Sequence, residues 1–328
     1  MKRNGSRSFV RNDPFAHNGF FARNKLFARG RLFAPQKSPH PKKNRQDARA
    51  ACRMLAPSLL GLAVFVLLPF AETVRRSFCD TLGEHWQGLQ NYRATLQNEA
   101  FQTAARNTAR FLGLSLPLLM AVSFLVALML CAGSMRHTRR ARIFKTTFLL
   151  PLAIPTTSIA LLWKALFAQY GFLNTLLTHL GWERVDFLSG EAAFRVLLFT
   201  CLWKNTGLMV LLWCAGMDSV SNDLYEAAAV DGANRAQRLV FITLPHLGIP
   251  AFLVLTLSIL QAFKVFREAY LVAGSYPPES IYLLQHLFNN WFLIMDLPRL
   301  TAAASLLVLA LFVPIALLAR RQSKGSSD

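Results

Sequence analysis

The sequence predicts an all-α integral membrane protein with six transmembrane helices. Of its 328 residues, 53% are hydrophobic and only 16% are charged, whereas soluble domains carry roughly 25% charged residues. Six apolar runs approach the roughly 20 residues that a helix needs to cross a bilayer core of about 30 Å. A net charge of +19 is also compatible with a nucleic-acid partner, but the apolar runs favour a membrane protein, and we expect no nucleic acid to bind.

The segment before the first apolar run, residues 1–53, is strongly basic. It holds 14 Lys and Arg residues against two acidic ones. Phe-Ala pairs recur in it every six residues, which would distribute the phenylalanines around a helix instead of along one face. We therefore expect a disordered cytosolic tail, with contact to anionic lipid or to a protein partner as the alternative.

The apolar runs define the predicted domain organisation. The first span is residues 54–71, and an external segment follows at 72–103. The transmembrane domain is predicted at 104–319, with spans at about 111–131, 146–168, 196–217, 247–273 and 300–319, a cytosolic loop at 219–246 and a cytosolic tail at 320–328. Prolines recur in these spans, which membrane helices tolerate because neighbouring groups satisfy the freed carbonyls.

The distribution of cations predicts the orientation. Segment 132–145 carries five Lys and Arg residues within ten positions, whereas segment 72–110 spreads five over thirty-nine. Because Lys and Arg accumulate in short cytoplasmic loops, we expect 132–145, 219–246 and both termini to be cytosolic.

Sequence motifs for catalysis are absent. There is no GxxxxGK[ST] phosphate loop, no HExxH and no GxSxG, so the chain is not expected to be an enzyme or to hydrolyse ATP by itself. The five cysteines form no CxxC pair and are interpreted as small apolar side chains. We expect neither a cofactor nor a metal ion.

The predicted cytosolic loop reads DLYEAAAVDGANRAQRLVFITLPHLGIP, which indicates an amphipathic helix, a glycine break and a second helix that leads into the membrane. Asp223 is predicted to cap the first helix. Gly232 lacks a Cβ and can turn the chain sharply. The residues that give the loop its pattern are Glu226, Ala227, Ala228, Gly232, Ile242, Leu244 and Pro245. An ordinary amphipathic helix at the membrane interface is the alternative interpretation.

At these positions the chain resembles the permease subunits of binding-protein-dependent ABC importers, in the carbohydrate-uptake branch of maltose and glycerol-phosphate permeases. Their signature is Glu-Ala-Ala, three residues, Gly, nine residues, then Ile-x-Leu-Pro, and the similarity extends over about residues 55–320. The resemblance implies a type-1 ABC importer transmembrane domain. It also implies four partners: a second permease subunit, an ABC ATPase dimer, an extracytoplasmic solute-binding protein and a sugar substrate. The seven patterned residues would couple the chain to the ATPase.

Polar residues inside the spans predict the substrate pathway, because they are costly in lipid. The candidates are Lys204, Asn205, Gln261 and Lys264. Snorkelling to an interface, or pairing with a backbone carbonyl, is the alternative for Lys204. Tryptophans could stack on sugar rings or belong to interfacial belts; they are Trp163, Trp203, Trp213 and Trp291.

The end of the fifth span departs from the resembled family, because Lys264, Arg267 and Glu268 make it unusually charged. The solute therefore stays open between a sugar and another solute such as glycerol phosphate, a polyol or a peptide. A membrane interaction protein with a lipid-binding basic tail is the alternative from a different functional class.

Overall fold

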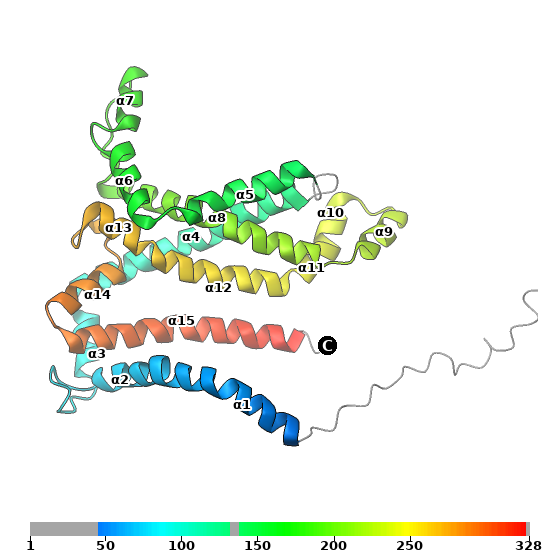
Figure 1. Ribbon diagram of the computed structural model, residues 1–328. Coiled ribbons are helices and arrows are strands. Elements are labelled where there is room, and N and C mark those ends of the chain that lie inside the picture. Colours follow the sequence, from blue (N-terminus) through cyan, green and yellow to red (C-terminus); the bar gives the residue numbers. More distant parts are fainter. Residues whose placement is uncertain (1–44, 132–137, 326–328) are drawn as a thin grey trace, which may run out of the picture. The chain divides into compact units, whose positions relative to one another are not determined.

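The computed structural model describes residues 45–131 and 138–325, which are divided into two compact units between Leu67 and Leu68 (Figure 1). The tail predicted to be disordered, residues 1–53, lies outside the described residues up to residue 44, whereas its last part, residues 45–53, is helical and begins α1. The first unit contains α1 (Arg45–Leu62) and the π-helical turn η1 (Ala63–Leu67). Large apolar side chains are exposed along it, with Met54 at 82% and Phe65 at 80%. Such an exterior is expected where a helix faces lipid or a partner protein.

The second unit contains the remaining helices. In chain order they are α2 (Leu68–Arg76), α3 (Gln90–Gln97), α4 (Glu99–Cys131), α5 (Arg139–Ala153), α6 (Thr156–Phe167), α7 (Phe172–His179), α8 (Gly190–Asp218), α9 (Asn222–Val230), α10 (Arg235–Arg238), the π-helical turn η3 (Leu239–Thr243), α11 (Leu244–His246), α12 (Gly248–Lys264), α13 (Phe266–Ala273), the 3₁₀ turn η4 (Glu279–Ile281), α14 (Leu284–Leu293) and α15 (Leu297–Gly325). The described residues contain no β-strand, only an isolated bridge between Cys79 and Trp86.

Five helical stretches in the described residues are long and apolar enough to cross a membrane. They are Cys52–Arg76, Glu99–Cys131, Gly190–Asp218, Gly248–Ala273 and Leu297–Arg320. A sixth crossing arises if the bent pair Ile143–Ala153 and Thr156–His179 counts as one span. The all-helical membrane fold predicted from the apolar runs is therefore confirmed.

The predicted third span is not a continuous helix, because the chain bends by 91° between α5 and α6. Pro155 explains the position of the bend. Its backbone is extended at φ −57° and ψ 141°, and a proline disfavours the helical conformation of the residue before it, here Ile154. Helix α5 accordingly ends at Ala153, and α6 begins at Thr156.

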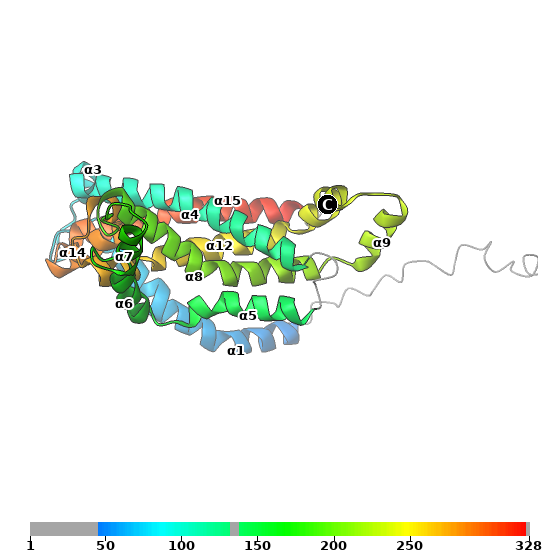
Figure 2. The same ribbon diagram turned by 90° about the horizontal axis from the view of Figure 1, so that it is seen from above.

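Helices α4, α8 and α12 pack side by side, and α5 lies along α8 (Figures 1 and 2). The buried positions of α4 recur every three or four residues from Phe101 to Leu130, so one helical face supplies the contact. In α8, Gly207 lies against the backbone of α5, and a Cβ there would overlap the Phe148 carbonyl oxygen. Only glycine permits this close helix approach.

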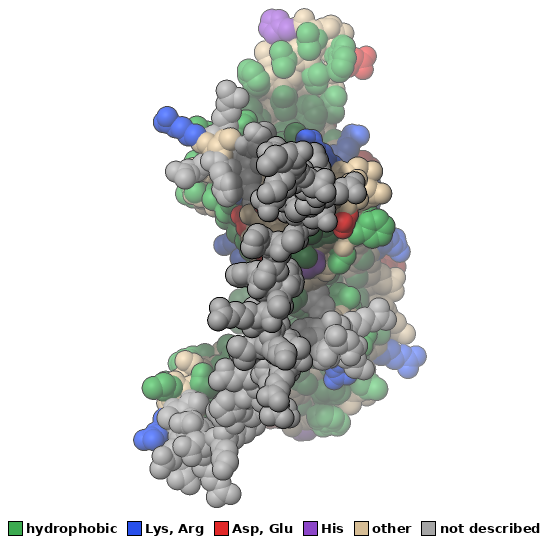
Figure 3. All heavy atoms as spheres, turned by 90° about the vertical axis from the view of Figure 1, so that its right-hand side faces the viewer, with side chains coloured by type: hydrophobic (Ala, Val, Ile, Leu, Met, Phe, Trp, Pro, Cys, Tyr) green, Lys and Arg blue, Asp and Glu red, His purple; other side chains and the backbone are tan. Residues whose placement is uncertain are grey.

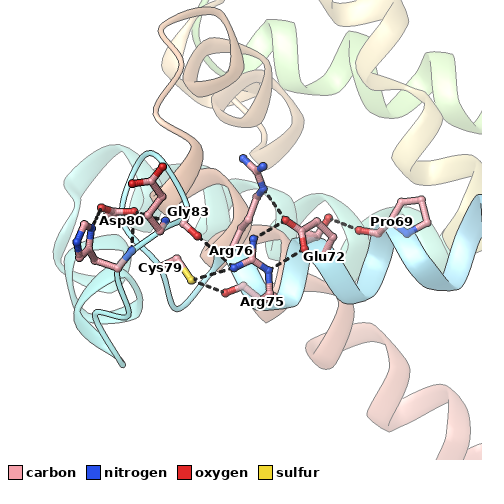
Figure 4. A network of polar contacts seen from close by, with 10 residues as sticks. Pro69, Glu72, Arg75, Arg76, Cys79, Asp80 and Gly83 are labelled. Atoms are coloured by element: carbon pink, nitrogen blue, oxygen red, sulfur yellow. Dashed lines mark hydrogen bonds and ion pairs between the residues drawn. The ribbon is translucent and has the colours of Figure 1, made fainter.

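A polar network holds the end of α2 to the loop that follows it (Figure 4). The Glu72 carboxylate accepts hydrogen bonds from Arg75 Nε at 2.8 Å and Arg76 Nε at 2.9 Å, and Arg75 Nη1 donates to the Gly83 carbonyl at 3.1 Å. Asp80 accepts from the Glu84 backbone N–H at 2.9 Å. Burial by itself would raise the pKa of Asp80, but hydrogen bonds from Glu84 and His85 lower it below its ordinary value.

Candidate functional site

A cavity of about 280 Å³ lies where the break between α5 and α6 and the junction of α12 and α13 meet α8. One wall is the break between α5 and α6, residues 152–156, and another is the junction of α12 and α13 around Val265. Interrupted helices leave backbone groups unpaired, which membrane proteins tolerate where the break lines a cavity or is buried in protein. Its polar lining residues are Thr156, Lys204, Asn205, Gln261, Lys264, Arg267 and Glu268.

The structure brings all four predicted pathway residues to this cavity. Lys204 and Asn205 reach it from α8, together with Cys201 one turn earlier. Gln261 and Lys264 reach it from the last turn of α12. Residues three and four apart lie on the same helix face, which applies to Gln261 and Lys264 and to Cys201 with each of the two α8 residues. The meeting of the two helices is a tertiary contact.

Lys204 forms a buried ion pair with Glu268. Its Nζ donates to Glu268 Oε1 and, at 3.3 Å, to Thr156 Oγ1. The Lys204 side chain is 15% exposed and that of Glu268 only 3%. Lys204 therefore neither snorkels to an interface nor pairs with a backbone carbonyl, because its charge is balanced inside the protein.

Sequence reasoning missed Glu268 and Thr156 as partners of Lys204. The sequence does contain a signal, since a cation and an acid that both interrupt apolar spans are each costly in lipid unless paired. The fourth and fifth spans hold several cations but few acids, so Glu268 is a natural partner for one of them. The choice of Lys204 over the nearer Lys264 depends on how α8 and α13 pack.

In the described part of the chain, the other two cations of the cavity have no acidic partner. Lys264 and Arg267 are both exposed, and among the described residues no carboxylate lies within 4.0 Å of either. The cavity is lined by three cationic side chains and one acidic side chain. Since Glu268 is paired with Lys204, two positive charges are left facing the open space.

None of the four candidate tryptophans lines this cavity. Trp163 is buried, and its ring lies 5.5 Å from Trp203 and 5.2 Å from Phe167. Trp213 packs edge-on against Phe124, and its indole N–H donates to Ser123. Trp291 is stacked on Phe101. These rings belong to helix packing, in which aromatic pairs are common.

The predicted coupling loop contains a tight turn at Gly232. Helix α9 ends at Val230, and Gly232 has a φ of +80°. The Ala233 N–H reaches back to the Ala228 carbonyl at 2.8 Å, and the Gly232 N–H reaches the Ala229 carbonyl at 3.2 Å. This pair of hydrogen bonds is a Schellman motif, which requires a left-handed residue at its turn.

The start of α9 differs from the prediction. Ser221, and not Asp223, is the N-cap, because its hydroxyl accepts the Asp223 backbone N–H at 3.2 Å. Asp223 instead lies in the first helical turn, where its negative charge interacts favourably with the helix dipole.

Two further contacts fix the turn. Asn234 and Gln237 form a capping box at the start of α10, and the Tyr225 hydroxyl lies 2.9 Å from Thr243 Oγ1, which links α9 to η3. Glu226 is exposed on α9, and the apolar side chains of Val230 and Phe241 are 89% and 74% exposed. Figure 3 views the molecule from the side that carries α9 and α10, where hydrophobic side chains and both basic and acidic side chains are visible.

Comparison with known proteins identifies one matching family model. Residues 124–325 match the model of the binding-protein-dependent transport system inner membrane component. This segment includes the cavity and the Gly232 turn, and it covers more than half of the chain.

Curated relatives and a solved structure are similar over most of the chain. The arabinooligosaccharides transport system permease protein AraP of Bacillus subtilis is 31% identical over 69% of this chain and 72% of its own. The sulfoquinovosyl glycerol transport system permease protein SmoG of Agrobacterium fabrum is 30% identical over 76% of this chain and 83% of its own. A bacterial ABC transporter involved in the import of the acidic polysaccharide alginate shares the fold, with a TM-score of 0.72, 24% identity, and coverage of 86% of this chain and 98% of that chain.

Proposed function

The chain belongs to the family of binding-protein-dependent transport system inner membrane components, and from this premise we propose that it carries a sugar across the cytoplasmic membrane through the cavity beside Lys204. The relatives are named for the transport of arabinooligosaccharides and of sulfoquinovosyl glycerol. The observation that carries the proposal is the convergence of Lys204, Asn205, Gln261 and Lys264 on one cavity beside the break between α5 and α6. Polar groups within apolar spans are the default indication of a pathway.

The free energy for transport has to come from another subunit, since the sequence contains no phosphate loop. We propose that an ABC ATPase dimer docks on the loop around Gly232, and that a second permease subunit completes the pathway. A solute-binding protein delivers the sugar from the opposite side of the membrane. Both termini and the Gly232 loop then face the cytosol.

The loop around Gly232 is rigid and exposes groups that an ATPase subunit can contact. Its turn is fixed by the Schellman motif, the capping box and the Tyr225 contact. A displacement of α9 therefore moves α11 and α12 as well, because the turn between them does not bend. Exposed Val230 and Phe241 offer apolar contact area, and exposed Glu226 can accept charge-assisted hydrogen bonds from a basic group on the ATPase.

The test is charge reversal at Glu226 in the complete importer, reconstituted in vesicles. Glu226→Lys should reduce retention of the ATPase and ATP-dependent solute uptake by about tenfold or more, because an attractive contact becomes a repulsive one. Glu183→Lys is the matched control, since Glu183 is also exposed and lies in the loop after α7. Normal uptake and ATPase retention in Glu226→Lys would refute the proposed coupling.

A further inference from the structure

We propose that the cavity selects a polyhydroxylated solute that bears an anionic group, such as an acidic sugar, over a neutral sugar. This inference rests on the proposed transport function and specifies its substrate class. It follows from the charge balance of the cavity, from the backbone at its edge and from the amide groups that remain open in it.

The charge balance is the first argument. Lys204 and Glu268 neutralise each other as a buried pair, while Lys264 and Arg267 line the same space without an acidic partner among the described residues. Both lie within the apolar stretch Gly248–Ala273, where an uncompensated cation is costly. An anionic group on the solute offsets that cost, and a neutral sugar does not.

The backbone at the α5–α6 break adds positive potential to the wall that it forms. Pro155 and Thr156 line the cavity, and Thr156 is the first residue of the twelve-residue helix α6. Pro155 occupies the N-cap position and provides no side-chain cap. The first N–H groups of a helix carry a partial positive charge and favour anions. The start of α6 therefore favours an anionic group in the cavity, as Lys264 and Arg267 do.

The remaining polar groups of the cavity can form hydrogen bonds with the hydroxyl groups of a solute. Asn205 Nδ2 donates to the Cys201 carbonyl at 2.8 Å, which leaves its Oδ1 as an acceptor. No hydrogen bond from the described residues engages the Gln261 amide, which offers both donors and an acceptor. The volume of about 280 Å³ is just below the usual range of small-molecule sites, roughly 300–1,000 Å³, so the cavity holds one ring of a solute at a time.

The sign of the potential can be measured without knowing the solute. In an importer whose permease carries Gln261→Cys and has its native cysteines replaced by alanine, the rates of modification by an anionic and a cationic methanethiosulfonate reagent are compared. When each rate is divided by the same reagent's rate with a free thiol, the anionic reagent should react about tenfold faster than the cationic one. The double variant Lys264→Gln with Arg267→Gln should remove that preference. Lys164→Gln, which removes an exposed cation outside the cavity, is the control. Equal rates, or faster modification by the cationic reagent, overturn the proposal.

Uptake by the intact importer identifies the source of the anionic group. Digalacturonate, glycerol 3-phosphate and maltose are offered together, and ATP-dependent accumulation is measured for each. Preference for digalacturonate indicates an acidic sugar, and preference for glycerol 3-phosphate indicates a phosphorylated polyol. ATP-dependent uptake of maltose alone leaves the permease function intact and overturns the charge inference. If none of the three accumulates, the proposed function is called into question, while the reagent ratio still decides the sign of the cavity.

Discussion

The ion pair between Lys204 and Glu268 joins two helices through charges that neither could hold alone. Each group sits in an apolar span, and each is largely buried. Transfer of a single charge from water to such a site costs several kcal/mol, and the pair recovers most of that cost only while both partners are present. The pair therefore fixes how α8 and α13 are positioned around the cavity.

We predict that Lys204→Met destabilises the protein by about 3 kcal/mol, because it leaves the Glu268 carboxylate buried without its cation. The double variant Lys204→Met with Glu268→Gln should recover most of this loss, since no charge then remains unpaired. Thermal unfolding of the detergent-purified protein measures both effects. Lys164→Met, at an exposed position, should change the unfolding temperature little. A double variant as unstable as Lys204→Met would mean that the pair does not account for the loss.

A second residue-scale prediction concerns the acid stability of His286 in α14. This side chain is fully buried, its Nδ1 accepts the Leu283 backbone N–H at 3.2 Å, and burial lowers its pKa from 6.5 to about 4. The folded state therefore binds fewer protons than the unfolded state between these values. Its contribution to stability is fully present above pH 6.5 and is lost as the pH falls towards 4, by about 2 kcal/mol at pH 5.

The measurement is the unfolding temperature at pH 7 and pH 5 for the wild type and for His286→Asn, whose side-chain oxygen can accept the same N–H but does not titrate. The variant should be less stable at pH 7 and should lose less stability on acidification. An equal acid-induced loss in both proteins would show that other groups cause it.

At the scale of helices, the sequence predicted where apolar segments lie but not where they are interrupted. Each span is visible as a long apolar run, because lipid imposes that composition on any crossing helix. The bend at Pro155 was not predicted, since prolines inside membrane helices are often tolerated without a break, as Pro117 is within α4. The four candidate pathway residues are polar interruptions that the sequence makes visible, whereas the partner of Lys204 depends on tertiary packing.

The Gly232 turn provides the prediction at this scale. Gly232→Val forces a β-branched residue to a φ of +80°, which should cost roughly 1–2 kcal/mol or unwind the end of α9. Because the turn joins the proposed docking helix to the membrane, solute uptake should fall about tenfold while the amount of protein in the membrane stays near normal. Uptake in reconstituted vesicles and membrane yield are the two measurements.

Gly181→Val is the matched control for that variant. Gly181 has a φ of +81° and, like Gly232, leaves open space where a Cβ would lie, but it follows α7 on a different loop. Similar strain is thus introduced away from the proposed ATPase contact. If both variants reduce uptake equally, the loss reflects general instability and not a failure of coupling.

For the whole molecule, the apolar exterior and the family match agree on a membrane-embedded subunit. Large hydrophobic side chains are exposed along α1, α4 and α15, as expected where lipid or another subunit replaces water as the surrounding medium. Composition alone predicted this class, because a chain with so few charges cannot solvate such a surface. The sidedness of the molecule depends instead on short charged loops, and it calls for a direct test.

We predict that the Gly232 loop and the loop after α2 lie on opposite sides of the membrane, with the Gly232 loop in the cytosol. The cations of segment 132–145 favour this orientation. Single cysteines at Asp231 and Gln87, both exposed, are introduced into a chain whose native cysteines are replaced by alanine. In intact cells a membrane-impermeant maleimide should label Gln87→Cys and leave Asp231→Cys unlabelled, and Asp231→Cys should react only after the membrane is opened. Labelling of Asp231→Cys from outside would invert the topology, and an ATPase in the cytosol then could not reach the loop proposed to couple it.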